Sequence, residues 1–229
     1  ISQQRAEEVA ALLKGSRAVL ENQDFEPAAQ AIFTACKNVI GAVSGYVALL
    51  NKDGTENDVL YLDSGGLPCT VDPDLPMPIR GLRADAYRTC RAVYNNDFMH
   101  SGWEQLMPEG HVCLNNVLFA PLVLGGKAVG LLGLANKPGG FTDEDARMAM
   151  AFGEIAAVAL RNSHMLEALT DSEKRFHGIV AQSHDAIVLL DEQGSVIEWN
   201  RSAEQLFDIP RGDVIESPLS LIVERVMPD

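Results

Sequence analysis

The chain has little positive charge and no long apolar run. Its 229 residues include 18 Lys and Arg against 32 Asp and Glu, a formal net charge of −14. Neutralising phosphates takes clustered basic residues, so this balance argues against nucleic acid and anionic membrane surfaces as partners. No stretch approaches the roughly 20 apolar residues that a membrane span requires, and the N-terminus has no signal-peptide core. We therefore expect no membrane span and a soluble, cytoplasmic location.

Cysteines and catalytic motifs are also scarce. The four cysteines, Cys36, Cys69, Cys90 and Cys113, show no CxxC spacing, so reduced thiols are expected and no metal site is defined. The sequence contains no GxSxG, Walker-type, HExxH or kinase ATP-binding motif. Without a matched nucleophile, base and orienting residue, we expect no catalytic site in this chain.

A β-hairpin is the clearest feature that is present. Two apolar runs, Val117–Leu124 and Val129–Ala135, flank Gly125-Gly126, and a two-residue turn with positive φ favours glycine. Pro121 lacks an N–H, so it must lie at a sheet edge or a bulge. The sequence therefore predicts two antiparallel strands over residues 117–135.

Other segments predict helices around such a sheet. Thr142 is followed three residues later by Asp145, the capping-box arrangement that begins a helix. Residues 6–22 have helical periodicity interrupted at Gly15-Ser16, and a second helix follows Pro27. Residues 45–50 and 59–62 form a second hairpin, and residues 84–91 a short helix. This order favours an α+β fold, an antiparallel sheet covered by helices.

Three stretches resemble a GAF domain, the small-molecule sensing module of bacterial and archaeal signalling proteins. They are the hairpin at 117–135, LANKPGGFTDED, and PCTVDPDLPMPIRGLR, and the resemblance covers residues 26–169. It implies a GAF-like antiparallel sheet with helices on its faces, in a multi-domain sensor of the histidine kinase type. The expected divisions are an N-terminal signalling helix at 1–22 and a GAF domain with a long C-terminal helix at 23–169.

Residues 63–115 are the expected ligand-binding segment. The segment is rich in proline near its start, and a loop of this length usually has a binding or lid role. The GAF resemblance implies a ligand between this segment and the sheet. The candidate pocket residues are Tyr61, Cys69, Met77, Arg80, Tyr87, Phe98, Met99, Trp103, His111 and Phe119. For the apolar ones, the competing interpretation is ordinary core.

Several ligands and activities remain open. Arg80 and Arg83 offer bidentate hydrogen bonds to a carboxylate or phosphate, or else hold a loop. Cys69 and His111 are candidate haem ligands, although no CxxCH motif is present. The NKFDE signature of nucleotide-binding GAF domains and the Asp-Ile-Pro block of phytochromes are absent. A GAF-fold methionine sulfoxide reductase using Cys69, Cys90 or Cys113 is the enzyme alternative.

The helix that begins after Thr142 carries a heptad pattern. The predicted seam comprises Phe152, Ile155, Ala159, Asn162, Leu166 and Leu169, with Asn162 as the polar residue that fixes register. We expect a parallel homodimer through the N- and C-terminal helices. The alternative is that residues 148–159 pack on the domain's own sheet.

A linker helix is expected at 170–185, and residues 186–229 form a third pattern. Asp191, Gly194 and Asn200 have DxxGxxxxxN spacing within two short strands, which resembles the beginning of a PAS domain. A partial PAS sheet leaves apolar groups uncovered. Examples are Leu219, Leu221, Ile222 and Val226. We expect this segment to be poorly ordered, exchanged with a partner, or completed by further residues. The whole chain would then relay the pocket state through a dimeric helical bundle to the PAS domain and a downstream output domain.

Overall fold

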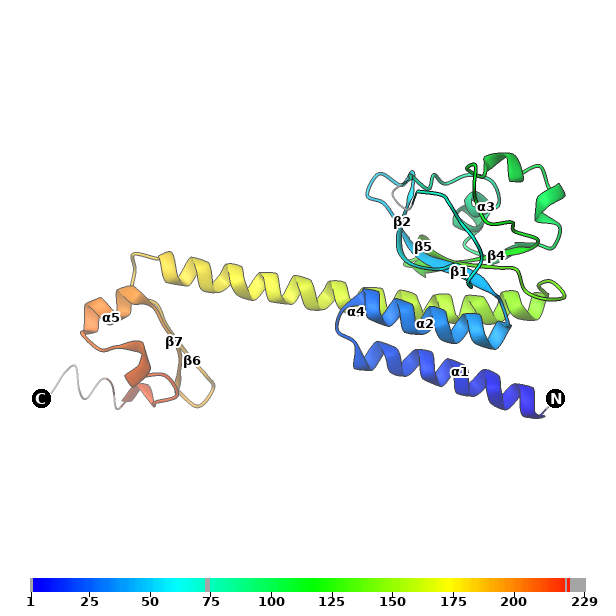
Figure 1. Ribbon diagram of the computed structural model, residues 1–229. Coiled ribbons are helices and arrows are strands. Elements are labelled where there is room, and N and C mark those ends of the chain that lie inside the picture. Colours follow the sequence, from blue (N-terminus) through cyan, green and yellow to red (C-terminus); the bar gives the residue numbers. More distant parts are fainter. Residues whose placement is uncertain (1, 73–74, 221, 223–229) are drawn as a thin grey trace, which may run out of the picture. The chain divides into compact units, whose positions relative to one another are not determined.

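The computed structural model describes residues 2–72, 75–220 and 222 (Figure 1). The chain divides into two compact units, residues 1–165 and 166–229. Within the described residues, no helix is both long and apolar enough to cross a membrane.

The first unit is built on a five-stranded antiparallel sheet. Its strands are β1 (Ser44–Leu50), β2 (Asn57–Asp63), β3 (Val93–Asn95), β4 (Val117–Leu124) and β5 (Lys127–Ala135). They lie in the order β2-β1-β5-β4-β3, and the predicted hairpins β1–β2 and β4–β5 are confirmed. The three-residue strand β3 was not predicted, because so short a segment carries no alternation of its own.

The β4–β5 hairpin has the expected turn and the expected proline position. Gly125 and Gly126 both adopt positive φ, at 57° and 79°. Strand β3 pairs only with Val117–Phe119, so β4 has a free edge at Pro121. The missing N–H of the proline therefore removes no ladder bond there.

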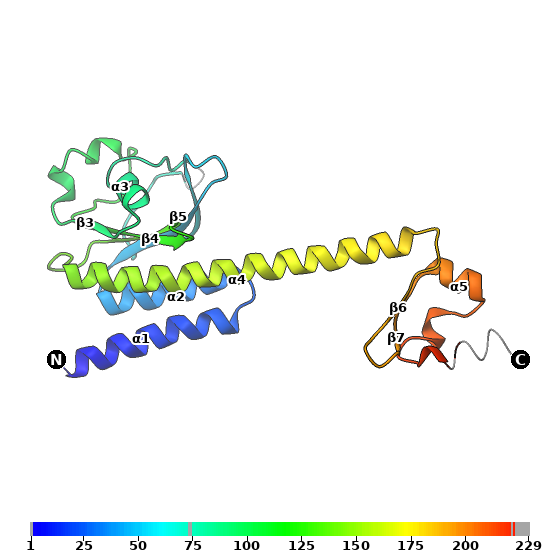
Figure 2. The ribbon, with the colours of Figure 1, turned by 180° about the vertical axis from the view of Figure 1, so that it is seen from behind.

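Helices cover both faces of this sheet. They are α1 (Ser2–Glu21), α2 (Phe25–Ile40), α3 (Leu82–Thr89) and α4 (Asp143–Gln182). Helices α2 and α4 lie along one face with α1 packed against them, and α3 lies on the other face (Figures 1 and 2). The short 3-10 helices η1 (Phe98–His100) and η2 (Glu104–Leu106) follow α3. The α+β fold class is confirmed.

The sheet separates two apolar cores. The larger core contains Phe33 of α2, Phe152 of α4 and the strand residues Leu118 and Leu132. The smaller core lies beneath α3 and includes Leu82, Ala86, Phe98, Phe119 and Leu131. Adjacent residues of β4 and β5 thus point into different cores.

Helix α1 runs through Gly15 without a break, so the predicted interruption is wrong. A Cβ added at Gly15 would lie 3.1 Å from the Phe152 ring of α4. The glycine is buried at a close crossing of two helices, and this packing outweighs its low helix propensity.

The start of α4 has the predicted capping box. The Thr142 N–H donates to Asp145 Oδ2 at 2.8 Å, and the Asp145 N–H donates to Thr142 Oγ1 at 3.3 Å. Further along α4, a Cβ added at Gly153 would lie 2.7 Å from the Pro121 carbonyl oxygen of β4. Helix α4 therefore touches the sheet backbone at Gly153.

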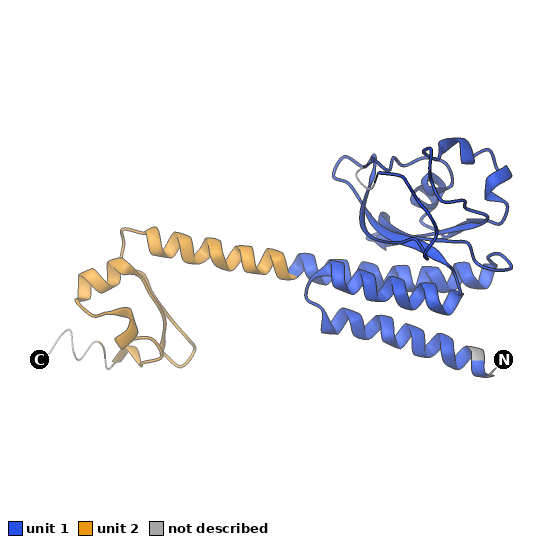
Figure 3. Ribbon diagram, in the orientation of Figure 1, with its two compact units in different colours: residues 1–165 blue, residues 166–229 orange. Residues whose placement is uncertain are grey.

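The second unit contains the end of α4, strands β6 (Val188–Leu190) and β7 (Val196–Trp199), helix α5 (Arg201–Phe207) and the 3-10 helix η3 (Arg211–Asp213) (Figure 3). Asp191 Oδ1 accepts from the N–H groups of Gln193 and Ser195 in the turn, and Gly194 has φ 82°. The predicted hairpin and helix are confirmed. Helix α4 is continuous to Gln182, so most of the predicted linker at 170–185 belongs to it.

Asn200 connects the parts of this second unit. Its Oδ1 accepts from the N–H groups of Ala203 and Ile187 at 2.9 Å each. Its Nδ2 donates to the carbonyls of Val180 at 3.0 Å and Asp185 at 2.9 Å. The polar residue of the predicted motif thus caps α5 and ties it to the end of α4.

The expectation that the apolar residues after α5 are unburied is wrong for two of them. Ile222 is buried and Leu219 packs beside it, in a cluster that includes Trp199. The segment after α5 returns over the hairpin, where the Val196 N–H donates to the Ser217 carbonyl at 2.9 Å. Leu221 and Val226 lie outside the described residues.

Candidate functional site

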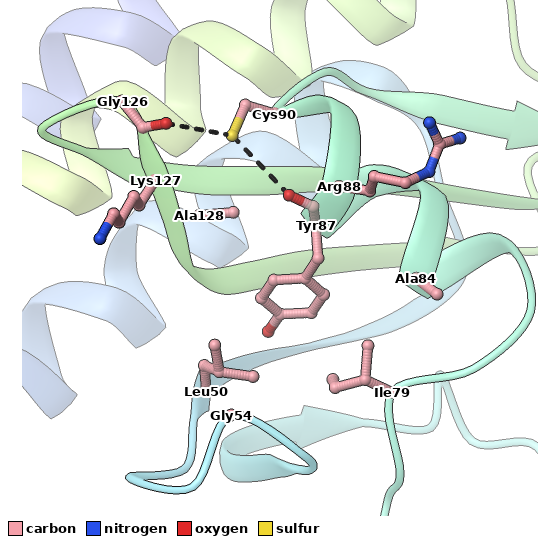
Figure 4. A pocket seen from close by; sticks show the side chains of 10 residues that line it. All are labelled: Leu50, Gly54, Ile79, Ala84, Tyr87, Arg88, Cys90, Gly126, Lys127 and Ala128. Atoms are coloured by element: carbon pink, nitrogen blue, oxygen red, sulfur yellow. Dashed lines mark hydrogen bonds between the residues drawn. The ribbon is translucent and has the colours of Figure 1, made fainter.

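A cavity of about 460 Å³ lies between α3 and the nearby ends of the strands. Figure 4 shows that Tyr87 points from α3 across this cavity toward Leu50 and Ile79. The lining residues are Leu50, Gly54, Ile79, Ala84, Tyr87, Arg88, Cys90, Gly126, Lys127 and Ala128. The volume is in the range of small-molecule sites.

Helix α3 is held over the sheet by its apolar side. Leu82 and Ala86, four residues apart, are both buried in the smaller core. The helix begins after Gly81, whose φ of 61° suits glycine, and ends at Cys90 in the left-handed region. This placement turns the neighbouring pair Arg83 and Tyr87, also one turn apart, toward β1 and β2.

Four polar side chains from three elements meet beneath α3: Tyr46 of β1, Asn57 of β2, and Arg83 and Tyr87 of α3. We call this set the polar cluster. Tyr87 Oη donates to Asn57 Oδ1 at 2.5 Å. Asn57 is itself held by its backbone N–H, which donates to the Met77 carbonyl at 2.9 Å. Tyr87 belongs both to this cluster and to the cavity lining, so the cluster adjoins the cavity.

The Tyr46 ring lies across a glycine in the neighbouring strand. Tyr46 of β1 pairs with Gly133 of β5, and a Cβ added at Gly133 would lie 2.5 Å from the ring. Burial raises the pKa of Tyr46, and the nearby Arg83 guanidinium opposes this rise. Burial likewise raises the pKa of Tyr87. Both phenols therefore stay neutral at physiological pH.

Two groups of the polar cluster are buried without a hydrogen-bond partner. They are Tyr46 Oη and Asn57 Nδ2. The Arg83 guanidinium is close enough to act on the Tyr46 hydroxyl, but no hydrogen bond of normal geometry joins them. Among the described residues, no carboxylate forms an ion pair with Arg83. The site therefore presents donors in excess of acceptors.

The predicted pocket residues fall into several groups. Tyr87 lines the cavity. Phe98, Met99, Trp103 and Phe119 belong to the smaller core on the same face of the sheet.

Three other predicted pocket residues serve the framework. Tyr61 packs against Phe33 in the larger core, with ring centroids 5.5 Å apart, so its prediction as a pocket residue is wrong. Arg80 donates to the Leu106 carbonyl at 2.5 Å, which is the loop-holding alternative. Met77 contributes its backbone carbonyl to Asn57.

Cys69 and His111 lie on adjacent segments but not in this cavity. The Thr70 N–H donates to the Gly110 carbonyl at 3.1 Å, which brings the two segments together. Cys69 is exposed, and His111 Nδ1 is 2.8 Å from the Val112 carbonyl oxygen. Neither residue lines the described cavity, so the pair does not fit a haem enclosed there.

The predicted dimer seam divides into two parts. Phe152 and Ala159 are buried in the chain's own larger core and Ile155 packs against it, so they are not available to a partner. This is the alternative left open for residues 148–159. Asn162, Leu166 and Leu169 are exposed.

Sequence reasoning missed Tyr46 and Asn57. Tyr46 lies in a mostly apolar strand, and nothing in the sequence pairs it with Gly133. Asn57 follows the turn of the first hairpin, where an asparagine is ordinary turn chemistry.

The fold is shared with solved GAF domains of low sequence identity. A GAF domain of a phosphoenolpyruvate-protein phosphotransferase from Coxiella burnetii is 14% identical with TM-score 0.61, covering 71% of this chain and 98% of that chain. A free methionine-R-sulfoxide reductase from Neisseria meningitidis, solved with its substrate, is 17% identical with TM-score 0.55, covering 69% and 91%. These likenesses show the fold alone.

The family models agree with this fold. A comparison with curated proteins found no match. The family model for the GAF domain matches residues 22–161, and the model for the PAS fold matches residues 174–226. The chain therefore belongs to the GAF domain family, and its GAF domain is followed by a PAS fold.

Proposed function

We propose that this chain is the ligand-sensing part of a signal-transduction protein of the sensor histidine kinase type. A small molecule binds between α3 and the sheet, and its presence changes how α4 packs on the other face. The observation that carries the proposal is the cavity of about 460 Å³, which adjoins a polar cluster with unmet hydrogen-bonding groups. Two successive sensory domains are consistent with a role in signalling.

The relay runs through the sheet. Phe119 and Leu131 contact the core beneath α3, while the adjacent Leu118 and Leu132 contact the core beneath α2 and α4. Strand β4 also touches α4 directly through the Pro121 carbonyl. A ligand shifts this arrangement only by its differential affinity for two states, typically worth about 1–3 kcal/mol.

The output is a parallel homodimer of helices. Among the large apolar residues exposed on α4, Val158, Met165, Leu169, Phe176 and Ile179 are spaced 7, 4, 7 and 3 residues apart, which fits a heptad seam that a second copy of the chain would cover. Leu166 of the predicted seam is exposed beside them. Helix α1 exposes Val9, Leu13 and Leu20 with the same periodicity. The paired helices would carry the signal to the PAS fold and a downstream output domain.

A cavity-filling variant tests the ligand site. The full chain is screened against a small-molecule library by thermal unfolding, together with Ala84→Trp, which fills the cavity, and Gln30→Trp, on the exposed side of α2. Compounds that raise the melting temperature of the wild type and of Gln30→Trp should fail to raise that of Ala84→Trp. Equal shifts in all three proteins would contradict a ligand site beneath α3.

Two alternatives have their own observations and tests. Haem is suggested by the adjacent segments of Cys69 and His111, and a Soret band lost in Cys69→Ala or His111→Ala would support it.

Sulfoxide reduction is suggested by Cys90 in the cavity lining. Turnover of free methionine sulfoxide at catalytic rates, lost in Cys90→Ser, would replace the sensor proposal.

A further inference from the structure

The unmet groups of the polar cluster indicate what kind of ligand it accepts. Buried polar groups in native proteins nearly always have a partner, so an unpartnered group has to be explained by a ligand or a water. Tyr46 Oη and Asn57 Nδ2 are two such groups beneath the same helix. Asn57 is 5% exposed, so bulk water does not reach it freely.

Together with Arg83, these groups offer more hydrogen-bond donors than acceptors. The Asn57 Oδ1 is already occupied by the Tyr87 hydroxyl at 2.5 Å, which leaves the amide N–H groups free. Tyr46 carries one neutral O–H, and Arg83 carries five N–H donors. A ligand group that satisfies these donors must carry several acceptor atoms.

The charge of the site points the same way. The chain has a net charge of −14, and other basic residues such as Lys37 and Lys137 form ion pairs, with Asp63 and Asp145. Arg83 forms none with a described carboxylate. A planar guanidinium that has no ion-pair partner among the described residues matches carboxylate and phosphoryl oxygens by bidentate hydrogen bonds.

The position of the cluster fits one end of a ligand. Tyr46 and Leu50 lie on the same strand four residues apart, and alternation places them on the same face of the sheet. Leu50, Ile79 and Ala84 line the apolar part of the cavity, and Tyr87 adjoins both parts. A ligand can thus place a polar head at the cluster and a short apolar part beneath α3.

We propose that the cluster of Tyr46, Asn57 and Arg83 binds the oxyanion group, carboxylate or phosphoryl, of a small molecule whose remainder occupies the cavity. This inference rests on the proposed function, because it names the chemical class that the sensor site recognises. Arg83 supplies the charge, and Tyr46 and Asn57 fix the orientation of the oxygens.

Calorimetric titration of the full chain tests the proposal. The probes are acetate, succinate and inorganic phosphate, and succinamide is the neutral counterpart of succinate. We expect at least one of the three anions to bind and succinamide not to bind. Arg83→Gln should weaken that binding roughly tenfold or more, because a charge-assisted hydrogen bond is lost. Arg91→Gln removes the same charge from an exposed neighbour and should leave affinity within about twofold, since exposed charges are largely screened.

A conservative variant at the same position separates loss of the binding group from misfolding. Arg83→Lys keeps the positive charge but loses the planar guanidinium that forms bidentate hydrogen bonds. It should therefore bind the anion more weakly than wild type and more tightly than Arg83→Gln. Equal affinity of wild type and Arg83→Gln, binding of succinamide as tight as that of succinate, or no binding of any anion at millimolar concentration would overturn the inference. A neutral library compound that is blocked by Ala84→Trp would overturn it too, yet would leave the proposed sensor function standing.

Discussion

Substituting Gly153 by alanine tests the contact between α4 and the Pro121 carbonyl of β4, which the proposed signalling mechanism uses. The added Cβ would lie 2.7 Å from the Pro121 carbonyl oxygen, and real Cβ contacts are essentially never under 3.0 Å. The obstacle is sheet backbone rather than a flexible side chain, so α4 or β4 has to move. We take the upper end of the cost of overpacking, about 3 kcal/mol. Alanine in a helix gains about 1 kcal/mol over glycine, which leaves a net loss of about 2 kcal/mol.

Gly178 provides a matched control on the same helix. An added Cβ there meets nothing within 4 Å, so Gly178→Ala should show only the propensity gain of about 1 kcal/mol. Urea unfolding followed by far-ultraviolet circular dichroism measures both variants. The same substitution should thus destabilise the first unit at one position and stabilise the second unit at the other. If Gly153→Ala proved as stable as wild type, α4 would not press on β4 as we describe.

Three further predictions concern the dimer, the PAS fold and acid stability. Leu169→Asp should raise the dissociation constant of the proposed dimer at least about tenfold in sedimentation, because it places a charge in the seam. An unchanged dissociation constant would show that this part of α4 is not in the dimer interface. Asn200→Ala should destabilise the second unit by about 2–4 kcal/mol, since four hydrogen bonds are lost, whereas a loss under about 1 kcal/mol would contradict that role. The hydrogen bond from Lys37 lowers the pKa of Asp63, so this pair should stabilise the fold above about pH 4 and lose its effect as pH falls through the lowered pKa. Wild type should therefore be more stable than Asp63→Asn at neutral pH, and the difference between them should shrink as the pH falls through the lowered pKa; a difference that does not change with pH would argue against the pair.

Local chemistry made much of the fold predictable. The Gly125-Gly126 turn, the capping box at Thr142 and the Asp191, Gly194 and Asn200 spacing each depend on a few neighbouring residues. Their structures are fixed by bonds within a short segment, so a sequence pattern suffices to identify them.

The site was less predictable because it depends on strand register and on which face each residue occupies. Tyr46 meets Gly133 only because β1 pairs with β5 in one particular register. Tyr61 pairs with Val47, a residue of the larger core, so its ring points away from α3. Neither the register nor the orientation of the faces is present in a single strand pattern.

Helix packing explains the remaining differences. Gly15 looked like a break, yet it is the residue that lets α1 approach Phe152. The apolar stripe of α4 changes its role along the helix, since Phe152 and Ala159 face the chain's own core and Leu169 is exposed. One amphipathic helix has the same periodicity in both settings, and only the surrounding structure tells them apart.

Hydrogen exchange on the full chain tests the central claim most directly, with the tightest compound of the thermal screen present or absent. The account predicts slower exchange in α3 (82–89) together with a change in α4 at residues 149–157, where the helix packs on the sheet. Both changes should vanish in Ala84→Trp. Protection in α3 with α4 unaffected would show that the cavity binds a ligand without passing the signal through the sheet.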